Sequence, residues 1–203
     1  MVKVYIASIE NISINKLKLN KLPKYRREKI ARIRSEEAKL QSYAAGLLID
    51  NYISNKEIKI NEFGKPYADG VFFNLAHSGN LVILAVSDKA QVGCDVERLR
   101  DENFLRLGRV VYTDNEIEAL KSSDDMKRSF FEFWTKKEAY IKAIGEGFHF
   151  PVKSLDLTVS PDFVEKNGVK YHFVDYMLGD YGIMICSPDI DVEFIHVNNA
   201  LFV

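Results

Sequence analysis

The sequence predicts an α+β fold, in which helices are combined with antiparallel strands. Two long stretches, 24–52 and 130–144, carry apolar side chains at helical spacing, and most other apolar runs are short and strand-like. A faint repeat adds to this, because residues 81–88 (LVILAVSD) resemble residues 181–189 (YGIMICSPD). The repeat predicts two halves of about one hundred residues, each made of helices and antiparallel strands.

In the first half, residues 2–9 alternate between apolar and polar side chains and predict a strand. Residues 24–52 predict one long helix, because apolar residues recur at helical spacing among charged ones. Residues 63–66 (FGKP) predict a turn. Further strands are expected at 71–75, 81–86 and 91–97, with 76–80 (AHSGN) connecting the first two of these.

In the second half, the charged residues 98–107 are expected to begin a helix after a linker. Thr113 and Glu116 form a capping-box pattern, which predicts the start of another helix. The helix at 130–144 is expected to end at Gly145 and Gly147. The remaining strands are expected at 155–159, 169–176, 181–186 and 192–197.

The composition is that of an ordinary globular protein. The 203 residues suffice for one domain or two small ones with a substantial core. A net charge of −1 provides no global basic field for nucleic acid. Cys94 and Cys186 lie in apolar runs and are expected to be buried, reduced thiols. Because the amino terminus lacks a signal-peptide layout and no apolar run approaches a membrane span, we expect a cytoplasmic protein that does not bind membranes.

Two acidic residues end a strongly apolar run. Asp95 and Glu97 share one face of the 91–97 strand, about 6–7 Å apart, because alternate side chains of a strand point to the same side. They could be ordinary exposed carboxylates at a strand end. Their apolar context favours a site, because burying acids is costly unless a cation meets them.

Glu138 and Lys142 lie four residues apart on one face of the second long helix, with Trp134 on the same stripe. They could be an ordinary helix pair worth about 0.2–0.5 kcal/mol. If this helix meets Asp95 and Glu97, three carboxylates and one ammonium converge. Oxygen ligands suit Mg²⁺, which usually binds few carboxylates together with waters and a substrate phosphate. The pattern therefore predicts a site for phosphoryl chemistry.

Basic residues precede these acids. Ser78 and Gly79 follow His77, and their backbone N–H groups could approach an anion, although His77 could also be a loop histidine with a structural partner. The segment 26–29 (RREK) is most simply a solvated helix face, and its basic residues could instead meet a second phosphate.

Four segments then occur in one order: Gly64-Lys65-Pro66, 73–79 (FNLAHSG), 93–97 (GCDVE) and 134–142 (WTKKEAYIK). This series resembles the 4′-phosphopantetheinyl transferase superfamily, in its long, surfactin-synthetase-activating type. The resemblance covers nearly the whole chain, including 145–148 (GEGF) and Pro151. It implies a pseudo-dimer of two similar halves, each an antiparallel sheet packed with helices, with coenzyme A and the active site in the cleft between them.

By the same resemblance, residues 1–97 would bind the nucleotide end and supply the first metal ligands, and residues 98–203 would carry the catalytic helix. Mg²⁺ would be held with the coenzyme A pyrophosphate by Asp95, Glu97 and Glu138. Glu138 and Lys142 would be catalytic, with Lys142 also contacting the pyrophosphate. Coenzyme A would further be bound by Gly64, Lys65 and Pro66 at the adenine nucleotide, His77 at a phosphate, and Arg26, Lys29 and Ser42 at the 3′-phosphate.

Two positions need comment. Ala76 stands where the family often has Ser or Thr, so one hydroxyl contact to coenzyme A is expected to be missing. Glu116 lies where some relatives carry another acid, and we interpret it mainly as the helix cap.

The implied reaction moves 4′-phosphopantetheine from coenzyme A to a serine of an apo acyl or peptidyl carrier protein and releases adenosine 3′,5′-bisphosphate. Glu138, or a Mg²⁺-bound water that it orients, would be the base, and Lys142 would balance charge on the leaving group. Two alternatives stay open: a Mg²⁺-dependent nuclease, and a non-catalytic module that binds coenzyme A or a carrier protein. We expect a monomer, because one chain supplies both halves, and no nucleic-acid partner, because the net charge of −1 provides no global basic field.

Overall fold

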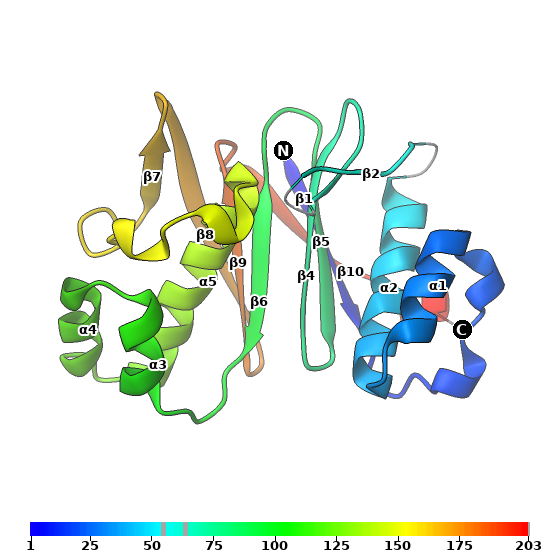
Figure 1. Ribbon diagram of the computed structural model, residues 1–203, viewed down its shortest axis with the longest axis horizontal. Helices are drawn as coiled ribbons and strands as arrows, with labels where there is room; N and C mark the ends of the chain where they lie inside the picture. The colour runs from blue at the N-terminus through cyan, green and yellow to red at the C-terminus, as the bar shows by residue number, and fades with distance from the viewer. Residues whose placement is uncertain (54–55, 63–64, 203) are drawn as a thin grey trace.

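The computed structural model describes residues 1–53, 56–62 and 65–202 and has an α+β fold with two four-stranded sheets (Figure 1). In spatial order, the first sheet consists of β10 (Val192–His196), β1 (Val2–Ser8), β5 (Leu81–Ser87) and β4 (Phe72–Ser78). The second consists of β6 (Gly93–Arg98), β9 (Tyr181–Ser187), β8 (Val169–Leu178) and β7 (Phe163–Lys166). β10 runs parallel to β1, and the other pairings within these sheets are antiparallel.

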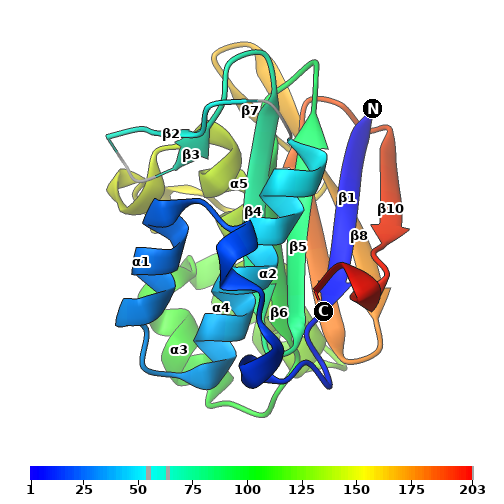
Figure 2. The same ribbon diagram turned by 90° about the vertical axis from the view of Figure 1, so that its right-hand side faces the viewer.

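Helices cover the outer side of each sheet. The first sheet carries α1 (Lys24–Arg32) and α2 (Glu36–Tyr52), which lie in front of its strands in Figure 2. The second half contains α3 (Phe104–Val111), α4 (Asp114–Lys121) and α5 (Met126–Ile144). A small hairpin pairs β2 (Lys59–Ile60) with β3 (Pro66–Tyr67). Short 3₁₀ helices lie at Ile14–Lys16, Leu19–Lys21, Gly147–His149, Val152–Ser154 and Asn199–Phe202.

Strand β5 shows why the sheets are apolar on both faces. Val82 and Leu84 belong to the core between the first sheet and α2, whereas Ile83 and Ala85 belong to a core that both sheets share. Because alternate residues of β5 enter different cores, this strand is a continuous apolar run without alternation. On the far side, α5 packs on β9 in a third core that contains Met184 and other buried side chains.

The two sheets adjoin at β4 and β6, which lie side by side in Figure 1. Side chains of β4 bridge the junction by accepting hydrogen bonds from the backbone of β6. Asn74 Oδ1 accepts from the Cys94 N–H at 3.0 Å, and Ser78 Oγ accepts from the Arg98 N–H at 3.1 Å. Residues of the two halves are thereby brought into contact along one line.

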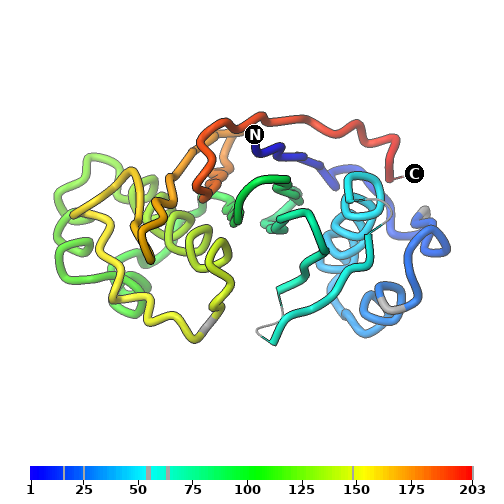
Figure 3. Tube along the Cα trace, turned by 90° about the horizontal axis from the view of Figure 1, so that it is seen from above, coloured from blue at the N-terminus to red at the C-terminus, as the bar shows by residue number. Residues whose placement is uncertain are grey.

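The sheets divide the chain differently from the boundary at residue 97. β6 belongs to the sheet of the second half, and β10 returns to the first sheet beside β1. Figure 3 shows this carboxy-terminal segment, in red, running beside the amino-terminal strand, in blue. Phe202 then joins the core under α2. Among the described residues, the helices lack the combination of length and apolarity that a membrane crossing requires.

The faint sequence repeat corresponds to two hairpins. β4 and β5 are joined by Gly79 and Asn80, and β8 and β9 are joined by Gly179 and Asp180. Both glycines have positive φ, 49° and 58°, a conformation that glycine adopts without a Cβ clash. The repeated segments therefore form β5 and β9, the strands that follow these two-residue turns.

Most predicted elements are confirmed, and three need correction. The stretch 24–52 is two helices rather than one, because Ser35 caps α2 by accepting a hydrogen bond from the Ala38 N–H. Residues 155–159 are not a strand but a loop that buries Leu157. His77 lies within β4, since the predicted connection shortens to the turn at residues 79–80. The capping box of Thr113 and the buried thiols are confirmed.

Candidate active site

Asp95 on β6 is the most constrained acid of the predicted set. Its side chain is buried, and Oδ1 accepts a hydrogen bond from Lys142 Nζ on α5 at 2.6 Å. Oδ2 is buried and has no hydrogen-bond partner among the described residues. Burial raises the pKa of Asp95 to about 7, the charges of Glu138 and Glu97 add to this, and Lys142 opposes it. A buried oxygen without a partner is costly, so this one is suited to an external ligand.

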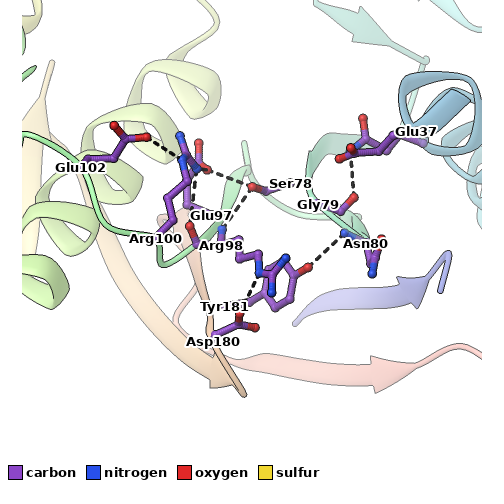
Figure 4. A network of polar contacts seen from close by, with 11 residues as sticks. Glu37, Ser78, Gly79, Asn80, Glu97, Arg98, Arg100, Glu102, Asp180 and Tyr181 are labelled. Carbon is purple, nitrogen blue, oxygen red and sulfur yellow. Dashed lines mark hydrogen bonds and ion pairs between the residues drawn. The ribbon is translucent and has the colours of Figure 1, made fainter. Parts of the chain in front are cut away.

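Glu97 lies two residues further along the same strand and has a similar arrangement. Its Oε2 accepts from the Ser78 hydroxyl at 2.9 Å and lies 3.4 Å from Arg100 Nη1 (Figure 4). Both protein donors thus use one oxygen of the carboxylate. In Asp95 and Glu97 alike, these protein contacts hold a single oxygen of the carboxylate.

Helix α5 brings the other two predicted residues to β6. Lys142 Nζ lies 2.6 Å from Asp95 Oδ1 and 4.0 Å from Glu138 Oε2, so the ammonium stands between a strand acid and a helix acid. Burial lowers the pKa of Lys142, but the charge and hydrogen bond of Asp95 outweigh this, and the net shift is upward. The predicted meeting of the strand and the helix is therefore confirmed for these residues.

Gly93 permits this close approach. A Cβ at Gly93 would overlap backbone atoms of Ala139 and Ala143, and would lie 2.9 Å from Ala143 Cα. The backbone of α5 therefore rests directly on β6, which brings Lys142 within hydrogen-bonding distance of Asp95. Asparagine or serine at this position would meet the same obstacle as alanine, because the clash involves Cβ itself.

The acids do not form a closed metal cage. Within residues 1–53, 56–62 and 65–202, no group of three or more His, Cys, Asp or Glu side chains gathers closely enough to hold a metal ion. The donor set nevertheless fits Mg²⁺, which usually uses one or two carboxylates together with waters and substrate phosphates. The partnerless oxygen of Asp95 supports this fit, and Glu97 supplies a second carboxylate from the same strand.

The predicted nucleotide-binding residues border a pocket of about 320 Å³. Lys65 and Pro66 line it together with Phe73 and Gly145. The Lys65 ammonium donates hydrogen bonds to the carbonyl oxygens of Lys142 at 2.6 Å and Ala143 at 3.3 Å, at the end of α5. Burial lowers the pKa of Lys65 to about 8. Lys65 thus joins the hairpin to the end of α5, and Gly64 lies outside the described residues.

The predicted phosphate-binding residues come from α1, α2 and β4. Partial loss of hydration and the positive charges of Lys142 and, more weakly, Lys29 lower the pKa of His77, whose side chain is still exposed. Arg26 is buried on α1, and Ser42 on α2 has a buried hydroxyl without a hydrogen-bond partner among the described residues. Lys142 and Lys29 thus both act electrostatically on His77, and Ser42 offers a hydroxyl that has no hydrogen-bond partner among the described residues.

Sequence reasoning missed the structural roles of two residues, Ser78 and Lys137. The sequence predicts only a backbone N–H of Ser78 for an anion, whereas in the structure its hydroxyl donates a hydrogen bond to Glu97. Lys137, next to Glu138, is fully buried and forms a 2.7 Å ion pair with Glu116. A signal for Lys137 exists in the sequence, because Phe133 and Ile141 lie one helical turn before and after it, and a lysine on an apolar helix face is rarely buried without a partner. Glu116 is both the predicted helix cap and half of this ion pair.

An apolar groove of about 360 Å³ adjoins the acids. Leu107 and Val110 of α3 and Trp134 of α5 line it, with Glu97 and Arg100 at the same groove. Leu107 and Val110 are exposed. The acid-lined site thus continues into an apolar surface.

Comparisons with known proteins point to one family. Residues 91–180 match the family model of the 4'-phosphopantetheinyl transferase superfamily. The 4'-phosphopantetheinyl transferase gsp of Aneurinibacillus migulanus is 38% identical over 125 residues, covering 56% of this chain and 52% of that protein. HetI of Nostoc sp., also named a 4'-phosphopantetheinyl transferase, is 38% identical over 102 residues, covering 48% of this chain and 43% of that protein.

A third relative is the 4'-phosphopantetheinyl transferase AcpT of Salmonella typhimurium, 34% identical over 109 residues, which cover 51% of this chain and 56% of that protein. The chain thus spans about half the length of the curated relatives it matches. The family match includes Asp95, Glu97, Glu138 and Lys142, the four residues that the structure gathers. Through this stretch, the chain is similar to the 4'-phosphopantetheinyl transferase superfamily.

Proposed function

We propose that the protein transfers the 4′-phosphopantetheine group of coenzyme A to a serine hydroxyl of an apo acyl or peptidyl carrier protein. The serine oxygen would form a bond to the phosphorus next to the pantetheine. The bond from that phosphorus to the bridging oxygen of the pyrophosphate would break, releasing adenosine 3′,5′-bisphosphate. The supporting observation is the buried Asp95–Lys142 contact with Glu97 and Glu138 beside it, inside the stretch that matches the superfamily.

Coenzyme A would lie in a cleft between two pseudo-dimeric halves. The repeated hairpins, β4–β5 and β8–β9, support two related halves. Residues of both halves meet at the β4–β6 junction, with His77 on one side and Asp95 on the other. The adenine nucleotide would occupy the pocket at Lys65 and Pro66. Along the chain, residues 1–97 would bind the nucleotide end and supply the first metal ligands from β6, and residues 98–203 would carry the catalytic helix.

The phosphates would be bound by the basic groups around this junction. Lys142 would neutralise charge on the pyrophosphate, and His77 would bind a phosphate next to it. Lys29, with Arg26 and Ser42, would contact the 3′-phosphate, and the unused hydroxyl of Ser42 supports this placement. Positive groups fixed before the reaction lower its barrier, because they need not reorganise as charge develops.

Asp95, Glu97 and Glu138 would hold Mg²⁺ together with the pyrophosphate. When bound, Mg²⁺ polarises the transferring phosphoryl group and stabilises the leaving phosphate. Glu138 would accept the proton of the serine hydroxyl, either directly or through a water that it orients. Its side chain is about one-third exposed, which leaves room for an approaching hydroxyl.

The carrier protein would approach over the apolar groove of α3 and α5. This groove contains Glu97, so a serine presented there comes near the acids. Its apolar lining suits the apolar part of a protein surface, and exposed apolar patches of this kind often mark interaction sites. The cytoplasmic location and the monomeric state expected from the sequence stay predictions.

One assay distinguishes this function from the two alternatives. Apo carrier protein is incubated with coenzyme A, Mg²⁺ and the protein, and the carrier is weighed by intact-mass spectrometry. We expect a mass gain of one phosphopantetheine group, lost in the Glu138→Gln variant. Nicking of plasmid DNA without carrier modification would indicate the nuclease. Binding of coenzyme A without either product would indicate the non-catalytic module.

A further inference from the structure

The turn between β4 and β5 is held from three sides (Figure 4). Ser78, at the end of β4, bonds both the side chain of Glu97 and the backbone of β6. The carbonyl oxygen of Gly79 accepts from Gln41 Nε2 of α2 at 2.9 Å. The N–H of Asn80 donates to the Tyr181 hydroxyl of β9 at 3.0 Å. These contacts come from three different elements, β6, α2 and β9, which together hold the turn in place.

The contacts of Ser78 define where its proton points. Its Oγ accepts from the Arg98 N–H at 3.1 Å, so a lone pair is used by the backbone of β6. A hydroxyl has one proton to donate, and the carboxylate of Glu97 is an acceptor only. The proton therefore lies on the 2.9 Å line to Glu97 Oε2. Ser78 joins a strand of the first half to an acid of the second.

This contact has a parallel on the neighbouring acid. Lys142 holds Asp95 through Oδ1 and leaves Oδ2 without a partner among the described residues. Ser78 holds Glu97 through Oε2, the same oxygen that Arg100 approaches. Each of the two carboxylates is thus held through one oxygen by a side chain from another element.

We propose that Ser78 is a positioning residue that orients Glu97 for cation binding, an inference that rests on the proposed function. Without the hydroxyl, Glu97 would rotate about its side-chain bonds, and its pairing with the exposed Arg100 would compete with the cation. Because His77 immediately precedes Ser78 in β4, the same strand end would set a phosphate ligand and a cation ligand relative to each other.

The test measures Mg²⁺ binding apart from catalysis. Mg²⁺ is titrated calorimetrically into protein saturated with coenzyme A, without carrier. Ser78→Ala is expected to weaken Mg²⁺ binding about 10- to 100-fold, the range typical of residues that orient metal ligands. Ser78→Thr keeps the hydroxyl and should restore binding. Coenzyme A affinity without Mg²⁺ should stay unchanged in Ser78→Ala, because Ser78 orients Glu97 rather than coenzyme A.

Two variants serve as controls. Ser87→Ala removes a serine hydroxyl at the other end of β5, where it accepts from the backbone N–H groups of Lys89 and Ala90. Tyr181→Phe removes the hydroxyl that holds Asn80 and keeps the Ser78 hydroxyl that donates to Glu97. Both should bind Mg²⁺ like the wild type. If Ser78→Ala does not fold, Ser78→Cys, whose thiol is a weak donor, carries the same expectation.

Three outcomes would overturn the proposal. Wild-type Mg²⁺ affinity in Ser78→Ala would show that Glu97 needs no hydroxyl, and transfer by the wild type would then leave the proposed function intact. Equal weakening in Tyr181→Phe would show that the rigidity of the turn matters rather than the contact with Glu97. A wild-type protein that binds no Mg²⁺ and modifies no carrier would overturn this inference and the proposed function together.

Discussion

Replacing Gly93 by alanine tests how the fold builds the site. The added Cβ would overlap the backbone of α5 at Ala139 and Ala143, so no side-chain rotation can relieve the clash. The helix must move away from β6, and overpacking of this kind typically costs about 1–3 kcal/mol, occasionally more. For a chain of this size, each kcal/mol lowers Tm by about 2–4 °C. The displacement would also break the 2.6 Å contact between Lys142 and Asp95.

The second sheet offers a matched control. Gly182 on β9 pairs directly with Glu97 of β6, and among the described residues a Cβ there would meet side-chain atoms alone, Leu99 Cδ1 at 3.5 Å and Met177 Sδ at 3.8 Å. Gly182→Ala should therefore be neutral or stabilise by about 0.4–1 kcal/mol, because alanine restricts the unfolded chain. Urea unfolding of both variants, with transfer rates, makes the comparison. A Gly93→Ala protein as stable and as active as Gly182→Ala would refute the reasoning.

Three further predictions concern charged residues. Lys137→Met should lower the free energy of unfolding in urea by about 3–5 kcal/mol, because it leaves Glu116 buried and charged. Lys136→Met should lower it by about 1 kcal/mol or less, because the partner of Lys136, Glu132, is half exposed. Equal losses in the two variants would contradict this. Burial raises the pKa of Asp95 to about 7, so the folded protein keeps a proton that the unfolded chain releases, and metal-free stability should fall between about pH 4 and 7. Asp95→Asn should remove that part of the pH dependence, and an unchanged profile would speak against it. Lys29→Ala should weaken coenzyme A binding about ten- to a hundredfold, as expected for a charge-assisted hydrogen bond, but should change dephospho-coenzyme A binding little; equal penalties would exclude the 3′-phosphate contact.

Much of the site follows from local sequence patterns. Asp95 and Glu97 share a strand face because their spacing is two, and Glu138 and Lys142 share a helix face because theirs is four. The sequence alone does not determine whether the two pairs meet, since no local pattern determines which strand a helix crosses. Gly93 explains why α5 can pack against β6, because only glycine lets the backbone of α5 rest on this strand.

The errors have physical causes as well. The single helix expected over 24–52 is divided at Ser35, whose side chain caps α2 where no Gly or Pro marks a break. The strand expected at 155–159 is a loop because its backbone is used elsewhere: the Leu157 N–H donates to Glu116, and the Leu155 carbonyl accepts from Lys137. The contacts of Leu155 and Leu157 join residues that are distant in sequence, so local propensity and periodicity cannot predict them.

The most direct test of the central claim is the stoichiometry of the transfer. Purified protein is incubated with coenzyme A, Mg²⁺ and an apo carrier, and both the modified carrier and the released nucleotide are quantified. We predict one adenosine 3′,5′-bisphosphate for each phosphopantetheine gained, with neither product when the acceptor serine of the carrier is replaced by alanine. Intact coenzyme A and unmodified carrier after incubation with several apo carriers would contradict the account.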